Sequence, residues 1–303
     1  MKVTRMDLDG AGSPMGLVAK ILKAEPDMPL QTPIEALARQ LDITEIQELT
    51  ADGFEGGLIT DEARSRGFIL VKRGAREQRR RFTIGHELGH FLMTSHKPPP
   101  SGFRCSREDL RRWNEKDQGA HPRMEVEANQ FSALILMPPP RLKFELAKFG
   151  EPDLAQIVSL AGTFNVSLEA AARAFATYNE EPVAIVVAQD RRIDKIYRSP
   201  SRFPWLAAQN GDDVPKTSLL FTARQQLHHP TEIGEARPEA WLESEWGKRM
   251  PGLFEQVFFQ QDGYALILLI AEVADDEEED SRWENKTSKE RLREQQGRWG
   301  SDR

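Results

Sequence analysis

The chain has 303 residues, a net charge of −7 and a sequence pI near 5.6. An acidic balance of this size argues against a protein whose main work is to grip nucleic acid over a wide surface. The single cysteine excludes an intrachain disulfide framework and fits a reducing compartment.

Neither end of the sequence indicates export or membrane insertion. Residues 1–16 lack the apolar core of a signal peptide. The apolar run at 264–274 is too short to span a bilayer and predicts a buried strand instead. We therefore expect a soluble cytoplasmic protein with no membrane contact.

The first half of the chain predicts a helix, a pair of strands and a second helix. Residues 34–41 have apolar side chains at helical spacing. β-like runs follow at 54–60 and 67–73, joined by a polar turn. The basic stretch 72–81 then leads into a helix that carries the sequence H-E-L-G-H at 86–90.

A long connection and a third strong helix follow. Residues 97–123 are polar and proline-containing, which predicts a loop with one short helix at 107–113. Residues 124–137 predict a helix that ends at a triple proline, because proline cannot continue a helix interior. Two or three further helices fit 141–177.

The composition then shifts towards strands. The runs 182–188 and 192–198 are β-like, and an Asp-Gly turn at 262–263 indicates a hairpin. We therefore predict a second, mixed α+β module at 179–273. Residues 274–303 are almost free of apolar side chains, which predicts a charged flexible tail.

The H-E-L-G-H helix carries a candidate metal site. His86 and His90 are four residues apart, so their imidazoles lie one turn apart on one helix face and can bind one ion. Glu87 lies beside them, where its carboxylate can reach a metal-bound water. Gly85 and Gly89 each cost the helix about 1 kcal/mol relative to alanine, which suggests that another backbone approaches closely there.

The third ligand is less evident. His96 follows His90 at the metzincin spacing, but Met93 stands where that motif has the glycine that ends the helix. If the helix continues, His96 lies too far along its axis to join the site. We therefore expect an exposed histidine at the helix end. A carboxylate from 124–137 is the alternative, and periodicity alone leaves both Glu125 and Glu127 open.

Two sequence motifs together resemble the ImmA/IrrE family of metallopeptidases. They are RRRFTIGHELGHFLM, which ends at Met93, and EVEANQFSALILMP, which begins at Glu125. Serine at 132, where alanine is common, and a longer connection between the motifs are departures that touch no ligand. The resemblance covers about residues 30–177 and implies that Glu125 is the third metal ligand.

The resemblance also implies a fold and a function. We expect an α+β protein with a zincin-like metallopeptidase domain at 1–178, which includes a helical, helix-turn-helix-like segment at 141–178. The module at 179–273 would be sensor-like and of GAF type. The implied activity is that of a zinc endopeptidase that cleaves a helix-turn-helix repressor encoded nearby, which derepresses stress or mobile-element genes. The alternative is a non-proteolytic, zinc-containing regulatory or toxin–antitoxin binding protein.

Roles for individual residues follow from this interpretation. Two imidazoles and one carboxylate leave a position for water on the ion, as in catalytic zinc sites, and Glu87 would be the general base. The same ligands do not exclude manganese. We expect the strand at 67–71 to lie at a sheet edge, where Phe68 and Leu70 would contact an added peptide strand. Cys105 is expected to be a lone exposed cysteine, with a thiolate that blocks the zinc as the alternative.

The sequence leaves the oxyanion-stabilising residue open and contains a segment with helix-turn-helix spacing. His121, Tyr178 and several arginines are candidates for stabilising the oxyanion, with no basis for a choice. Residues 160–176 have the spacing of a helix-turn-helix, but the second helix would offer one arginine and a glutamate to DNA. We therefore favour a purely structural helix pair and expect no nucleic-acid binding.

Overall fold

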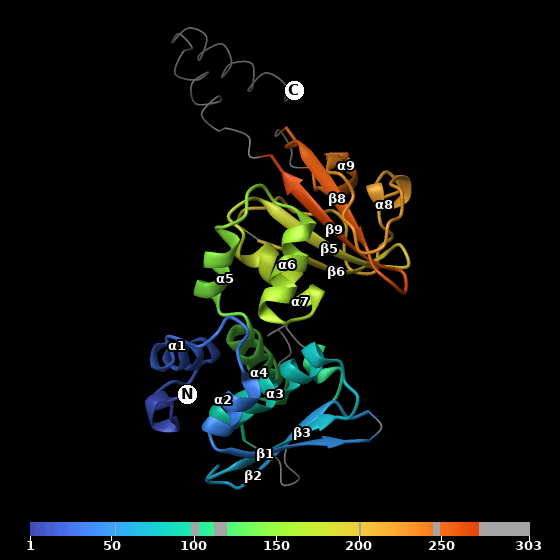
Figure 1. Cartoon of the computed structure of the whole chain (residues 1–303). Helices are drawn as coiled ribbons and strands as arrows, with labels where there is room; N and C mark the ends of the chain where they lie inside the picture. Colours follow the sequence, from blue (N-terminus) through green and yellow to red (C-terminus); the bar gives the residue numbers. More distant parts are fainter. Residues whose placement is uncertain (52, 98–102, 112–119, 200, 245–248, 273–303) are drawn as a thin grey trace, which may run out of the picture.

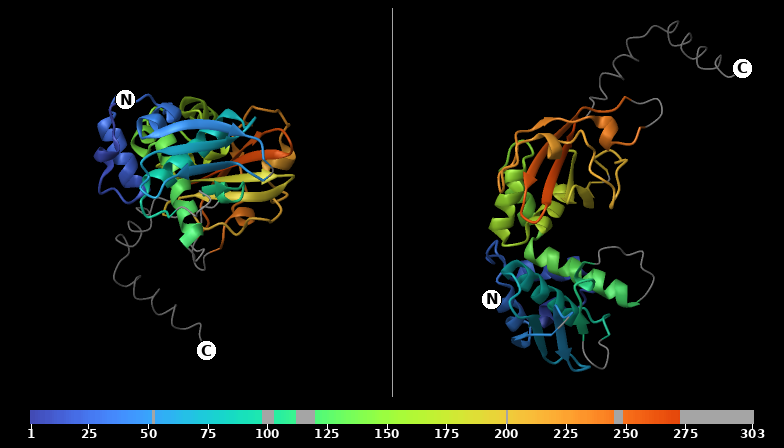
Figure 2. Two further views of the ribbon diagram at one scale, coloured as in Figure 1. Left: turned by 90° about the horizontal axis from the view of Figure 1, so that it is seen from below. Right: turned by 90° about the vertical axis from the view of Figure 1, so that its right-hand side faces the viewer.

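The structure is a computed structural model that describes residues 1–51, 53–97, 103–111, 120–199, 201–244 and 249–272. The predicted tail at 274–303 lies outside these ranges. Of the short helix expected at 107–113, residues 107–111 are described and contain a 3-10 turn at Asp109–Arg111, whereas 112–113 lie outside. Within the described residues, none of the helices has both the length and the apolar character needed to cross a membrane. Two lobes stack along the long axis of the molecule, each built on one β-sheet (Figure 1; Figure 2, right).

The first lobe contains a four-stranded mixed sheet. Its strands are β1 (Ile43–Leu49), β2 (Gly56–Thr60), β3 (Gly67–Lys72) and β4 (Phe103–Cys105). Their spatial order is β1-β3-β2-β4, with β1 parallel to β3 and the other pairs antiparallel. Strands β2 and β3 were predicted, whereas β1 and β4 were not. β1 was not predicted because its sequence does not alternate between apolar and polar residues, and six of its seven residues are not fully buried.

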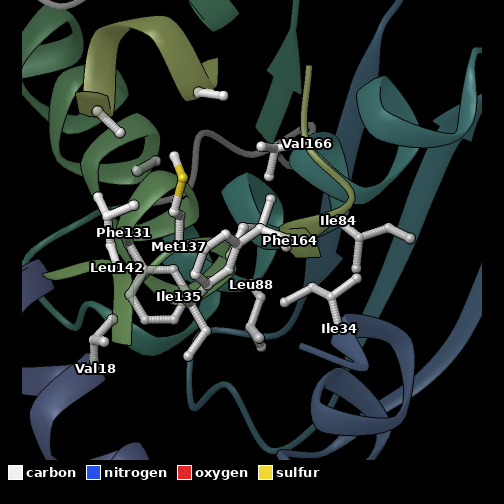
Figure 3. Packing of buried hydrophobic residues seen from close by; sticks show 14 of the residues in the cluster. Val18, Ile34, Ile84, Leu88, Phe131, Ile135, Met137, Leu142, Phe164 and Val166 are labelled. Atoms are coloured by element: carbon white, nitrogen blue, oxygen red, sulfur yellow. The ribbon is translucent and has the colours of Figure 1, made fainter. Parts of the chain in front are cut away.

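Helices cover this sheet and complete the first lobe. They are η1 (Arg5–Leu8), α1 (Pro14–Ala24), α2 (Ile34–Gln40), α3 (Glu77–Leu92), η2 (Asp109–Arg111) and α4 (Ala120–Leu136). Helix α3 packs against the sheet on one side and against α4 on the other. Figure 3 shows the apolar core at this junction, where Leu88 of α3 and Ile135 of α4 meet Ile34 of α2.

Three helices connect the lobes: α5 (Pro139–Leu146), α6 (Leu154–Phe164) and α7 (Leu168–Tyr178). The side chains of Asp153 and Ser167 cap the starts of α6 and α7, and Asn165 takes the left-handed conformation that ends α6. These helices lie beside the second sheet (Figure 1), although one apolar core runs from α3 and α4 through them to that sheet. The domain boundary at 178 stays a prediction.

The second lobe is a five-stranded antiparallel sheet in the order β6-β5-β9-β8-β7. Its elements are β5 (Val183–Gln189), β6 (Arg192–Arg198), α8 (Leu219–Thr222), β7 (Gly234–Glu235), α9 (Pro238–Trp241), β8 (Leu253–Phe259) and β9 (Tyr264–Ala271). Alternate residues of β5 enter two different apolar cores, because both of its faces are covered. The predicted α+β class is thus confirmed, and a GAF-like arrangement of the module stays a prediction.

Helix α7 packs on this second sheet. Its Glu169 accepts hydrogen bonds from Lys195 and Tyr197 of β6, at 2.5 and 2.8 Å. Arg173 lines a cavity between the lobes together with Tyr178 and Glu169. Glu169 thus ties α7 to the second sheet, and the expectation that this segment does not bind nucleic acid stays a prediction.

Candidate metal centre

Helix α3 holds the two candidate histidines at the centre of the first lobe. His86 and His90 are fully buried, and their Nε2 atoms lie 3.1 Å apart. The spacing of four residues produces this approach, because it places both rings on the face of α3 that is turned towards α4. Both side chains therefore point at one position between α3 and α4.

Glycines on α3 let α4 approach. A Cβ atom at Gly85 would lie 2.6 Å from Ser132 Oγ, and one at Gly89 would lie 3.1 Å from Phe131 Cδ1. Ser132 also donates a hydrogen bond of 2.7 Å to the carbonyl of Phe82, which ties the helices together. The close approach of a second helix at these glycines, expected from the sequence, is confirmed.

Glu125 reaches the histidines from the first turns of α4. Its Oε2 lies 3.2 Å from His86 Nε2, and its Oε1 lies 3.5 Å from His90 Nε2. Burial acts to raise the pKa of Glu125, but the interaction with the two histidines outweighs it and lowers that pKa far below its usual range. Burial also disfavours charge on His86, yet Glu125 raises its pKa, while burial lowers the pKa of His90 to about 3. The position between these side chains therefore attracts positive charge.

Cys105, on the edge strand β4, is a fourth side chain at the same point. Its Sγ lies 3.2 Å from His86 Nε2 and 3.8 Å from Glu125 Oε2. The expectation of an exposed cysteine is wrong, since only 2% of Cys105 is accessible to solvent. The burial of Cys105 could not be predicted from local pattern, because β4 has only three residues and lies in a stretch that predicts a loop.

The tautomer of His86 is set by Asn129 of α4. The amide nitrogen of Asn129 donates a hydrogen bond of 2.8 Å to the carbonyl of Asp109, which turns its oxygen towards His86. That oxygen lies 2.9 Å from His86 Nδ1 and accepts its proton. Neutral His86 consequently presents the lone pair of Nε2 to the site, as a metal ligand must.

The tautomer of His90 is set by a chain of hydrogen bonds through His96 to Glu127, called the His96 relay below. The Nε2 of His96 lies 2.9 Å from the carboxylate of Glu127, which can only accept, so His96 donates there. Burial lowers the pKa of His96, which favours its neutral form. Its Nδ1 then accepts a proton from His90 Nδ1 across 2.9 Å. The Nε2 lone pair of His90 therefore also points into the site.

The expected surface position of His96 is wrong, because α3 ends earlier than predicted. The helix stops at Leu92, and Met93 adopts φ −81° and ψ 103°, so no residue with positive φ is needed. Arg64 donates hydrogen bonds of 2.7 to 2.9 Å to the carbonyls of His90, Phe91 and Met93, which satisfies the helix end. The chain then turns back and buries His96 outside the four-residue donor group.

The donor group fits a zinc ion. Ligands at about 2.0–2.3 Å from a tetrahedral ion are separated from one another by about 3.3–3.8 Å. Five of the six separations between these donor atoms are 3.1 to 3.8 Å, close to that range. Donor atoms of His86, His90, Cys105 and Glu125 all lie within 4.8 Å of one another, and imidazole, thiolate and carboxylate are ordinary zinc ligands.

Glu87 lies beside this group and is fully buried. No hydrogen bond within ordinary geometric limits reaches either of its carboxylate oxygens from the described residues. Gly56 of β2 makes room for it, since a Cβ atom there would lie 2.8 Å from Glu87 Oε1. Burial raises the pKa of Glu87 to about 7, although the charge of His86 opposes the rise. A carboxyl group with this pKa can accept and return protons near neutrality.

The predicted edge position of the strand at 67–71 is wrong. Strand β3 lies inside the sheet, where it pairs with β1 on one side and β2 on the other. The main chain of Phe68 and Leu70 therefore offers no free hydrogen-bonding edge to a peptide. Among the described residues β4 pairs only with β2, so the edge nearest the metal centre belongs to β4.

Only one named oxyanion candidate lies near the donors. His121, in the first turn of α4, is 3.7 Å from Glu125 through its Nε2 and is largely exposed. Tyr178 instead lines the cavity between the lobes. His121 is therefore the better placed of the two for contact with a bound substrate.

Comparisons with known proteins agree with this geometry. The IrrE N-terminal-like domain family matches residues 38–175, which include all four donor residues. The resemblance to the ImmA/IrrE family is thus confirmed. The radiation response metalloprotease IrrE of Deinococcus radiodurans is 28% identical over 157 residues, which are 52% of this chain and 42% of that protein.

The likeness in structure extends beyond the IrrE-like domain. A Mycobacterium tuberculosis transcriptional regulator superposes with a TM-score of 0.53 at 14% identity, over 85% of this chain and 75% of the other. Identity this low indicates a shared fold only. Because the chain spans less than half the length of the Deinococcus relative, that protein's activity does not transfer to it as a whole.

Proposed function

We propose that this protein is a zinc-dependent endopeptidase. The observation that carries the proposal is the convergence of His86, His90 and Glu125 on one buried position, with the carboxylate of Glu87 beside it. The IrrE-like domain and the metalloprotease name of the Deinococcus relative support it. Zinc at this position would polarise a peptide carbonyl and activate water.

The protein's own residues have distinct roles in this proposal. His86, His90 and Glu125 hold the ion, and Asn129 and His96 keep the histidines in the ligating tautomer. Glu87 takes up a proton during attack and delivers it to the leaving amine, which its raised pKa suits. An extended substrate would pair with β4 rather than β3, since one edge of β4 pairs with no described strand.

The proposed substrate is a protein, namely a helix-turn-helix repressor encoded near this gene, and cleavage would derepress the genes it controls. Support comes from the family resemblance and from the radiation-response name of the relative. The cytoplasm, where such a repressor acts, is the proposed location. Manganese remains the alternative to zinc, and metal analysis of the purified protein decides between them.

The decisive experiment incubates the zinc-loaded protein with that repressor and analyses the fragments by mass spectrometry. Glu87→Gln is expected to lower the cleavage rate by about 10²–10⁴-fold, because the amide cannot accept the proton. Glu151→Gln, an exposed change of the same kind, is the matched control and should cleave normally. Unchanged biological activity in Glu87→Gln would support the non-proteolytic binding protein instead.

A further inference from the structure

The position of Cys105 is built by contacts on both sides of it. On β4, Cys105 pairs with Gly56 of β2, and its carbonyl accepts a hydrogen bond of 3.1 Å from the amide of Glu55. Ser106 follows and donates from both its amide and its hydroxyl to the carboxylate of Asp109, at 2.9 and 2.7 Å. The carbonyl of Asp109 is held in turn by Asn129, the residue that orients His86. The thiol is therefore placed by the same network that orders the metal ligands.

The buried Glu87 carboxylate points independently to a bound group at this place. Both of its oxygens are buried and accept no hydrogen bond of ordinary geometry from the described residues. A polar group in such a position is costly unless something charged or hydrogen-bonding lies opposite it. The centre is thus arranged for a cation, and the Sγ atom of Cys105 lies within 4.8 Å of each of the other donor atoms.

We propose that Cys105 is a fourth protein ligand to the metal and that it closes the site in the resting protein. This inference rests on the proposed function and concerns its regulation. Two imidazoles, a carboxylate and a thiolate complete a tetrahedron, as in structural zinc sites, and leave no position for water. The carboxylate and the thiolate together neutralise the charge of a divalent ion, which suits a site whose four side chains are all buried.

Exchange of the fourth ligand, from the Cys105 thiolate in the closed state to water in the open state, needs no oxidant or reductant. On closure, the thiol of Cys105 loses its proton to solvent, a sulfur–metal bond forms and a water molecule leaves the ion. On opening, water returns to the ion and the thiolate takes up a proton. Strand β4 pairs through only three residues, so we expect few hydrogen bonds to be strained when Cys105 moves away from the ion as a substrate pairs with the outer edge of β4.

Substitution of cobalt for zinc tests this ligand directly in the full-length protein. A thiolate bound to Co²⁺ gives an intense charge-transfer absorption band in the near ultraviolet, whereas imidazole and carboxylate do not. Because the chain has one cysteine, the band in the wild-type protein can come only from Cys105. We expect the band in wild type and its loss in Cys105→Ser. A cobalt-loaded wild-type protein without the band would overturn the proposal.

Metal affinity and cleavage give two further readouts. Competition with a chelator should show zinc bound at least about 10-fold more weakly in Cys105→Ser, in line with the cost of disturbing a metal's ligand environment. Cleavage of the repressor at saturating zinc should be faster in Cys105→Ser than in wild type. Slower cleavage, or equal zinc affinity, would contradict the closed resting site.

The outcomes separate this inference from the proposed function. A charge-transfer band together with no cleavage by wild type or Cys105→Ser would keep the ligand and reject the endopeptidase. Cleavage that depends on Glu87 without a charge-transfer band would keep the endopeptidase and reject the ligand. The wild-type spectrum needs no variant, so a folding defect in Cys105→Ser leaves the test intact.

Discussion

The two lobes bury polar side chains in different ways. In the second lobe the buried polar groups satisfy one another: Gln256 of β8 accepts from the amide of Leu154 and donates to Asp153 and to the carbonyl of Thr231, at 2.8, 2.8 and 3.0 Å. In the first lobe the buried lone pairs of His86, His90 and Glu125 face one another. The first arrangement fastens a helix to a sheet, whereas the second is complete only with a cation at its centre.

Removal of the metal is expected to produce the largest difference in stability between the two lobes. A ligand present at about 1,000 times its dissociation constant adds about 4 kcal/mol to the free energy of unfolding. Amide hydrogen exchange after chelation should therefore accelerate in α3 and α4 and stay unchanged in β5 and β9. Equal acceleration in both lobes would instead mean that the apolar core they share makes them one cooperative unit.

His96→Phe tests whether the His96 relay orders the metal site. The ring is kept in size but cannot accept the proton of His90, so the affinity for zinc should fall by about 10–100-fold. His229→Phe changes an exposed histidine in the second lobe and is the matched control. Competition with a chelating dye measures both, and equal affinities would show that the His96 relay has no part in metal binding.

Gly85→Ala should expose the cost of close helix packing in the first lobe. The new methyl group would meet the side chain and Cα of Ser132, and overpacking of this kind typically costs about 1–3 kcal/mol. Gly162→Ala, in α6, meets nothing within 4 Å and should stabilise the protein by about 0.5–1 kcal/mol. Urea unfolding of the two variants gives the comparison, and a stabilised Gly85→Ala would refute the close approach.

Asp153→Ala should have the smallest effect and leave metal binding unchanged. Asp153 caps α6 through the amide of Ala155 and also accepts from Gln256. Loss of such a cap costs about 1 kcal/mol. Thermal unfolding and zinc competition should therefore show a small destabilisation with normal affinity. A weakened zinc site in this variant would mean that the lobes are energetically coupled.

Features that depend on neighbouring residues in the chain could be predicted from the sequence. The spacing of His86 and His90 and the glycines beside them follow from helix geometry, and the apolar runs of β5 and β9 follow from burial on both faces. The family motif added Glu125, which periodicity alone could not choose over Glu127. The structure brings His86, His90, Glu87 and Glu125 together, and their roles in metal binding and catalysis stay predictions.

Other features depend on contacts between distant segments. The burial of Cys105 needs the pairing of β4 with β2, and the edge position of β4 depends on the order of the whole sheet. The early end of α3 needs Arg64, which lies 26 residues before His90. The absence of a glycine after His90 did not predict this end, because the guanidinium group of Arg64, and not a residue with positive φ, satisfies the last carbonyls of α3. Asn129 follows Glu125 by four residues and therefore lies on the same face of α4, so its contact with His86 could have been predicted from the sequence.

The turn that carries Arg64 shows how far a surface segment can reach. Arg64 lies between β2 and β3 with φ 51°, and its side chain donates a hydrogen bond to the carbonyl of His90, one of the four candidate metal donors. A loop of this kind usually tolerates insertions and tags. Here an inserted tag would withdraw a guanidinium group from the end of α3 and loosen the fold-back that buries His96. The freedom of this loop to vary is therefore limited by the buried helix end that its one side chain supports.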